Sequence, residues 1–225
     1  MNARETIFGR IREALSHPAH KSGGHDQASP KPLGAATAAD CMPFGGANAA
    51  EQLALFAQNA KELAADFYLV ETPEELHAQL AELAQREGWK RVASHAGELT
   101  AAACKVLGLP VTLTDGGYDV ADLEASDAGI TECEALVAQT GSVLVTSRAC
   151  GGRGLSVLPP HHVVLARRSQ LVADLNAAFA LLEARYAPSY PSMISFISGP
   201  SRTGDIERIL VLGAHGPKKL TIFCL

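Results

Sequence analysis

Paired cysteines are missing from this chain of 225 residues. None of its cysteines forms a C-x-x-C pair and their number is odd, which argues against a disulfide framework, a zinc ribbon and a cysteine-ligated iron–sulfur cluster. Any redox chemistry would therefore come from a bound cofactor or from a partner protein. The five cysteines are Cys41, Cys104, Cys133, Cys150 and Cys224.

A surplus of positive charge and a long apolar run are missing as well. The 19 Lys and Arg residues are outnumbered by 24 Asp and Glu residues, so no broad basic surface is available to neutralise a nucleic-acid backbone. No apolar run approaches the ~18 to 20 residues that cross a bilayer, and the charged opening of the chain is unlike a secretory signal. We therefore expect a cytoplasmic protein with no membrane span and no nucleic-acid partner.

Several catalytic and metal-binding signatures are also absent. The chain has no H-E-x-x-H motif and no G-x-S-x-G motif around a nucleophilic serine. His161 and His162 are adjacent, but neighbouring residues of a strand face opposite sides, so the two are not expected to share a metal ion. The sequence therefore predicts no metal site.

Composition divides the chain into three parts. Residues 1–16 carry Ile7 and Ile11 at helical spacing among charges, which predicts a short amphipathic helix. Residues 17–50 are rich in proline, glycine and alanine, and we expect a linker or an extended loop there. Residues 51–225 are expected to form one α/β domain.

Within this domain, short apolar runs alternate with longer amphipathic segments. The alternation predicts βαβ units and a mainly parallel sheet flanked by helices. At one helix start, Thr72 suits the N-cap, Pro73 the first turn and Glu75 a capping box. We expect strands at 67–70, 91–94, 110–114, 142–146, 162–166, 193–197 and 220–224, and helices at 49–63, 73–87, 99–107, 133–139 and 170–184.

The loop that follows the strand at 142–146 is the first candidate site, because ligands of open α/β sheets bind where strands end. Residues 147–160 hold three glycines together with Arg148 and Arg153. The glycines free main-chain N–H groups to converge, and the arginines add charge suited to a phosphate or carboxylate. A flexible surface loop with solvated arginines is an equally open interpretation.

The loop that follows the strand at 193–197 is the second candidate site. It gathers hydroxyls, a guanidinium and a carboxylate beside a possible short helix, whose free N–H groups would favour an anion. The same residues could instead form an ordinary helix cap. A turn at 213–217 then adds a histidine, either a general base or a structural residue. The polar residues concerned are Ser201, Arg202, Thr203, Asp205 and His215.

These stretches occur in a distinctive order along the chain. Q-T-G-S-V-L-V at 139–145 precedes S-G-P-S-R-T-G-D-I-E at 198–207, which is followed by G-A-H-G-P at 213–217. The order and spacing resemble the lactate utilization protein C family, which contains the LUD domain. The resemblance runs from about residue 50 to the end, and Gly204 stands where the family usually has alanine.

The resemblance implies both a fold and a biological setting. The implied fold is similar to that of the NagB, ribose-5-phosphate isomerase (RpiA) and CoA-transferase group. The implied setting is a three-protein system that oxidises L-lactate to pyruvate and whose two other members carry iron–sulfur clusters. This chain lacks cluster-ligating cysteines, so it would be the cluster-free subunit. The resemblance leaves the ligand or cofactor and the oligomeric state open.

The leading hypothesis is therefore a subunit of a lactate-oxidising complex, with a pocket for a small anionic ligand or cofactor between the two candidate loops. Arg153 and Arg202 would hold a carboxylate or phosphate, while His215 or Asp205 would move or polarise a proton. The other residues expected to contact the ligand are Thr140, Gly141, Ser142, Ser156, His161, Ser201, Thr203 and Gly216.

Two alternatives stay open at this point. One is a stand-alone enzyme that acts on a phosphorylated or acyl-CoA substrate, an idea that rests only on analogy of fold. CoA transferases of the implied fold use a glutamate nucleophile, and Glu132 and Glu134 are the only candidates near a strand end. The other alternative is a structural or regulatory subunit with no site of its own.

Overall fold

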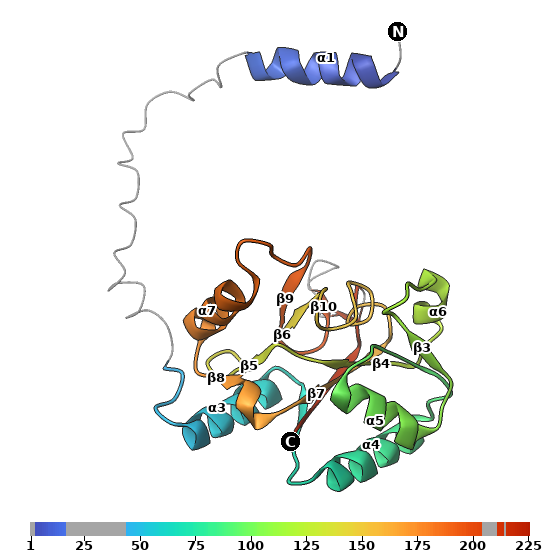
Figure 1. Cartoon of the computed structure of the whole chain (residues 1–225), viewed down its shortest axis with the longest axis vertical. Helices are drawn as coiled ribbons and strands as arrows, with labels where there is room; N and C mark the ends of the chain where they lie inside the picture. The colour runs from blue at the N-terminus through green and yellow to red at the C-terminus, as the bar shows by residue number, and fades with distance from the viewer. Residues whose placement is uncertain (1–2, 17–43, 204–210, 214) are drawn as a thin grey trace. The chain divides into compact units, whose positions relative to one another are not determined.

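The computed structural model describes residues 3–16, 44–203, 211–213 and 215–225 (Figure 1). Contacts divide the chain into two units, Met1–Met42 and Pro43–Leu225. In the first unit, helix α1 (Ala3–Ser16) occupies the segment where the amphipathic helix is expected, and it exposes Ile7, Phe8 and Ile11.

Most of the segment expected to be a linker, and Cys41 with it, lies outside the described residues. The second unit begins its regular structure with helix α3 (Ala49–Glu62), two residues before the expected domain start. Among the described residues, no helix combines the length and the apolar character that crossing a bilayer requires.

A six-stranded, fully parallel sheet forms the centre of the second unit, and it confirms the predicted α/β class. Its strand order is β1-β12-β7-β4-β2-β3. Helices α4 (Pro73–Glu87) and α5 (Glu98–Leu107) cover one face, where Leu80 and Ala103 pack against Ile130. The strands are β1 (Asp66–Leu69), β2 (Val92–Ser94), β3 (Val111–Leu113), β4 (Ala128–Glu132), β7 (His161–Ala166) and β12 (Lys219–Cys224).

A second, four-stranded sheet covers the other face of the parallel sheet (Figure 1). Val143 and Val145 of this sheet pack against Val164 and Ile222, so alternate residues of the central strands serve two cores. Helix α7 (Leu175–Tyr186) covers the outer face of the second sheet. The strand order is β8 (Leu171–Val172), β5 (Ala135–Val137), β6 (Ser142–Thr146), β9 (Ile194–Ile197), and a separate pair joins β10 (Arg202–Thr203) to β11 (Val211–Leu212).

Two of the predicted helices are wrong in whole or in part. Residues 133–139 form no helix but contain strand β5, whose Ala135 to Val137 are fully buried. Residues 170–184 begin with a 3₁₀ turn and strand β8, and the helix starts only at Leu175. Short apolar runs buried on both sides lack a diagnostic period, so tertiary packing decides their structure. Strand β4 and helix α6 (Val120–Glu124) were not predicted.

The start of helix α4 follows the prediction closely. Thr72 Oγ1 accepts a hydrogen bond from the Glu75 main-chain N–H at 3.1 Å, and Pro73 occupies the first turn. The Glu75 carboxylate accepts from the N–H of Glu71 at 2.9 Å, one residue further back than a capping box requires.

Replacing Thr72 by alanine is expected to lower the free energy of unfolding by about 1 kcal/mol, because the Glu75 N–H loses its acceptor. Equilibrium unfolding in urea measures the change. Thr72→Ser keeps the hydroxyl and is expected to stay close to the wild type. Equal stability of Thr72→Ala and the wild type would show that the cap contributes nothing.

Candidate functional site

The loop at 147–160 connects β6 to β7 by crossing the parallel sheet. It lies against the sheet at Gly129, where an added Cβ would be 2.3 Å from the main-chain oxygen of Leu155. Only glycine admits the loop at this distance. Residues 147–149 and 151–152 line one cavity beside the carboxyl ends of β2 and β3, whereas Ser156 and Val157 line another beside the amino ends of β7 and β12. We call these the carboxyl-edge cavity and the amino-edge cavity.

The amino-edge cavity lies between the two sheets and has a volume of about 240 Å³. The main-chain N–H of Ser201 donates to Pro217 O at 2.9 Å, and the N–H of Gly213 donates to Ser201 O at 2.8 Å, so the 198–201 loop is joined to the 215–217 turn. The cavity thus brings together four of the predicted residues from segments far apart in the sequence: Ser156, Ser201, His215 and Gly216.

His162 is the most deeply buried of the polar side chains that line the amino-edge cavity. Only 1% of it is exposed, and its Nε2 lies 2.9 Å from Thr131 Oγ1. Its Nδ1 has no hydrogen-bond partner in the described part of the chain. Burial lowers the pKa of His162 to about 3, so the ring is neutral at physiological pH. A buried ring nitrogen without a partner is the atom most in need of a ligand here.

Of the histidine pair, His162 lines the amino-edge cavity and the predicted His161 does not. His161 faces the other side of the parallel sheet, where Nε2 lies 2.8 Å from Thr221 Oγ1 and the ring meets Trp89 edge-on. Burial lowers the pKa of His161 to about 4. The predicted alternation of the two side chains is correct, and it removes His161 from the cavity and assigns His162 to it.

The two arginines expected to hold an anion lie elsewhere. Arg153 Nη2 donates to Ser192 O at 3.0 Å, and Arg202 Nη2 donates to Leu63 O at the end of helix α3. Neither arginine lines the amino-edge cavity, and both are exposed. Both guanidinium groups therefore donate hydrogen bonds to main-chain carbonyl oxygens, where the sequence predicted an anionic ligand.

The predicted residues Thr140 and Gly141 form the β5–β6 turn, away from both cavities. Gly141 has φ +61°, and a Cβ there would meet the Ala60 N of helix α3 at 2.7 Å. Ser142 Oγ lies 2.6 Å from Ser198 Oγ, and Ser198 lines the amino-edge cavity, so Ser142 is one hydrogen bond removed from it.

Two predicted residues remain, Thr203 and Asp205. The backbone of Thr203 pairs with that of Val211. Asp205 lies outside the described residues, and its predicted role stays a prediction.

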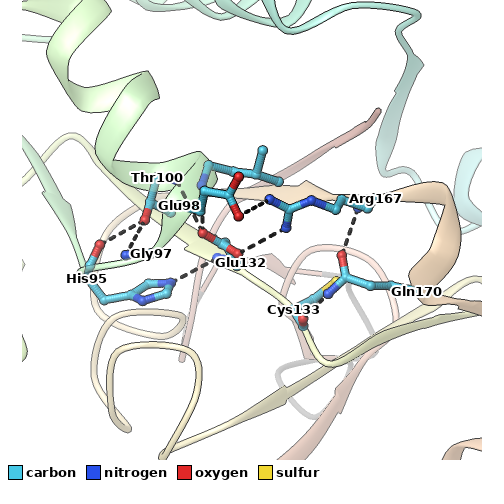
Figure 2. Close-up of polar contacts among 9 residues, drawn as sticks. His95, Gly97, Glu98, Thr100, Glu132, Cys133, Arg167 and Gln170 are labelled. Carbon is cyan, nitrogen blue, oxygen red and sulfur yellow. Dashed lines mark hydrogen bonds and ion pairs between the residues drawn. The ribbon is translucent and has the colours of Figure 1, made fainter.

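A polar cluster occupies the carboxyl ends of β4 and β7 (Figure 2). Glu132 Oε1 accepts from the N–H groups of Leu99 and Thr100 at 2.8 and 3.4 Å, at the start of helix α5. Arg167 bridges the Glu132 and Glu98 carboxylates at 3.7 and 2.8 Å. The Glu132 carboxylate is therefore committed to holding the helix start.

Glu134, the other candidate nucleophile, is also committed. Its side chain is fully buried and accepts from Thr146 Oγ1 at 2.8 Å, from the Tyr186 hydroxyl and from Arg185. Neither glutamate lines the amino-edge or the carboxyl-edge cavity, so these cavities give no support to a glutamate nucleophile of the CoA-transferase kind.

The described cysteines are free thiols, of which Cys133, Cys150 and Cys224 are buried and Cys104 is partly buried. Burial raises the pKa of the Cys150 thiol to about 12 and that of Cys224 to about 11. Within the described ranges, no three His, Cys, Asp or Glu side chains are grouped so that they could hold a metal ion.

The sequence is similar to one protein family and to several named proteins. A family profile described as the LUD domain matches residues 120–225. "Lactate utilization protein C" of Shouchella clausii is 38% identical over 106 residues, 47% of this chain and 46% of that protein. The protein of the same name from Bacillus subtilis is 34% identical over 106 residues, 46% of this chain and 44% of that protein. These matches span about half the length of the curated relatives.

A longer match and a solved structure extend the relationship. The crystal structure of a DUF162 family protein from Deinococcus radiodurans has the same fold, with a TM-score of 0.63 over 80% of this chain and 99% of that chain at 23% identity. "Lactate utilization protein C" of Deinococcus radiodurans is 31% identical over 147 residues, 56% of this chain and 68% of that protein. The chain therefore belongs to the lactate utilization protein C family.

Proposed function

We propose that this chain is the cluster-free subunit of an L-lactate-oxidising system and that the amino-edge cavity binds a small anionic ligand of that system. Membership of the lactate utilization protein C family supports the setting. The observation that carries the site is the unpartnered Nδ1 of buried His162, which lines the cavity.

The two walls of the cavity suit a small organic acid. His162 and the hydroxyls of Ser156 and Ser201 form a polar wall, and Ile197 and Leu220 contribute an apolar wall. A carboxylate or carbonyl oxygen would hydrogen-bond to the polar wall while a short alkyl group packs on the apolar wall. His162 is neutral, so it binds and orients the ligand rather than supplying a positive charge.

Lactate oxidation needs an electron acceptor. Oxidation of L-lactate to pyruvate removes two electrons and two protons. We propose that iron–sulfur partner proteins accept the electrons. His215, at the exposed end of the cavity, is the described histidine positioned to exchange a proton with solvent.

His162→Gln tests the site, because the amide can still contact Thr131 but offers no counterpart to Nδ1. In the complex co-expressed with its partners, we expect lactate oxidation to fall about tenfold, the effect of losing one hydrogen bond to a charged ligand group. The rate of lactate-dependent dye reduction measures the change.

His77→Gln, on helix α4, makes the same chemical change away from the cavity and is expected to keep wild-type activity. A folded, assembled His162→Gln complex with wild-type activity would remove the cavity from the reaction. That result would favour a structural or regulatory role for this subunit.

A further inference from the structure

The carboxyl-edge cavity is a second recess, which the proposed function does not use. Its volume is about 420 Å³, and it lies where β2 and β3 of the parallel sheet end. Ligands of open parallel sheets bind at the carboxyl ends of the strands. The side chains on which its chemistry depends are His95, Asp115 and Arg148, and none of them lines the amino-edge cavity.

His95 presents a fixed hydrogen-bond donor. It is 5% exposed, and its Nε2 accepts from the main-chain N–H of Glu132 at 3.0 Å (Figure 2). A ring nitrogen that accepts carries no proton, so the proton of the neutral ring is on Nδ1. Burial lowers the pKa of His95, which favours this neutral form.

The Nδ1–H of His95 has no acceptor among the described residues, since its one hydrogen bond uses Nε2. Nδ1 is not among the fully buried unpartnered atoms, so it opens to the cavity, where a ligand oxygen can take the place of water. The unused donor therefore points to a ligand oxygen at the carboxyl ends of the strands.

Arg148 adds a positive charge at the same cavity. Its Nη1 donates to Ser189 O at 3.1 Å and its guanidinium lies 5.4 Å from the centre of the Tyr186 ring, so the side chain is held from one side. No carboxylate of the described residues pairs with it. Asp115 is the acidic residue that lines this cavity, and its Oδ2 accepts a hydrogen bond from the N–H of Ala96 at 2.7 Å.

An apolar cavity adjoins the carboxyl-edge cavity. The two share His95 and Ala96 in their walls, and the second is lined by Val111 and Leu113 of edge strand β3. Leu113 is 53% exposed, although leucine gains free energy when it is covered. The recess that contains Arg148 therefore lies beside an apolar recess of about 390 Å³.

We propose that these joined cavities bind an amphipathic organic anion, with its charged group on Arg148 and the His95 Nδ1–H and its apolar part against Val111 and Leu113. The free oxygen of Asp115 accepts a hydroxyl or amide N–H next to the charged group. The amino-edge cavity plays no part in this binding.

Titration of the full chain with 1-naphthoate tests the proposal, followed by protein NMR shifts and calorimetry. Naphthoate carries both halves of the expected ligand, whereas acetate carries only the charge and 1-naphthalenemethanol carries only the rings. We expect naphthoate to bind more tightly than either half and to shift the amide signals of Gly151 and Gly152, which line the cavity.

Two variants separate the halves of the site. Arg148→Gln removes the charge and keeps a polar side chain, and we expect about tenfold weaker naphthoate binding. Leu113→Ser, at an exposed position, is expected to weaken naphthoate and leave acetate unchanged.

Arg91→Ala serves as the matched control, because Arg91 is exposed and precedes β2 at the opposite edge of the sheet. It is expected to bind naphthoate as the wild type does. Absence of naphthoate binding, or equal binding by Arg148→Gln and the wild type, overturns the proposal. Neither result bears on the lactate assay of His162→Gln, so the two proposals fail independently.

Discussion

Replacing Glu134 by alanine is expected to lower the free energy of unfolding by about 3 kcal/mol. The carboxylate is the acceptor for two buried hydroxyls, those of Thr146 and Tyr186, and its removal leaves both without their partner. Each unsatisfied buried group costs about 1–3 kcal/mol. The side chain of Arg185 is 51% exposed, so water can replace its lost contact. Equilibrium unfolding in urea measures the sum.

Glu183→Ala provides the control for this prediction. Glu183 lies on the same helix α7 but is exposed, so its replacement is expected to change stability by less than about 0.5 kcal/mol. A stability of Glu134→Ala within that range would mean that the two hydroxyls find other acceptors. Tyr186→Phe removes one of the donors and is expected to give a smaller loss than Glu134→Ala.

The strands near Glu134 show which parts of the fold could be predicted from the sequence. The strands β6 and β7 could be predicted almost to the residue, because β-branched runs that lie between turns strongly favour strands over helices. The run that follows Glu134 is short and apolar, and it forms strand β5 between β6 and β8, a pairing that the sequence does not reveal. Strand β4 escaped prediction because Gly129, an unfavourable strand residue, is required there by the crossing loop.

The division of the strands between two sheets explains much of what the sequence missed about the site. The rule that ligands bind at strand ends pointed to the loops after β6 and β9, but these strands are antiparallel neighbours in the smaller sheet. Their carboxyl ends therefore lie at opposite edges. In the parallel sheet, His95 and Asp115 follow the carboxyl ends of β2 and β3, two strands that the sequence predicted. They line one cavity because β2 and β3 are neighbours in the sheet, and the sequence does not reveal this strand order.

The predicted ligand-binding residues divide for a similar reason. Ser156, Ser201 and His215 line one cavity, and their contact with a ligand stays a prediction. Arg153 and Arg202 do not line this cavity. Their guanidinium groups donate to the main-chain oxygens of Ser192 and Leu63, which are distant in the sequence and become neighbours only in the folded chain. The importance of His162 depends on an unpartnered atom, which no spacing of residues in the sequence reveals.

Lowering the pH from 7 to 5 is expected to reduce the free energy of unfolding by about 4 kcal/mol through His161 and His162 together. Burial lowers their pKa values to about 4 and about 3, compared with about 6.5 in the unfolded chain. Between pH 6.5 and the folded-state pKa values, both histidines are protonated in the unfolded chain but neutral in the folded chain. The free energy of unfolding therefore falls as the pH falls. Each histidine contributes about 2 kcal/mol at pH 5.

Charged neighbours act differently on the two histidines. His161 is near Glu87, which favours its protonated form, and near Lys219 and Arg86, which oppose it. His162 has no carboxylate among the groups that shift its pKa, so burial dominates. Between pH 7 and pH 5 the two histidines are nevertheless expected to contribute about equally, because both folded-state pKa values lie below this interval.

Urea unfolding of His162→Gln at pH 7 and pH 5 isolates this contribution. The variant is expected to lose about 2 kcal/mol less than the wild type over this interval, whatever its stability at pH 7, because glutamine does not titrate. Comparing each protein with itself at the two pH values cancels the carboxylates common to both. Equal losses in the variant and the wild type would mean that His162 is protonated in the folded chain, and its Nδ1 would then be a charged donor in the amino-edge cavity.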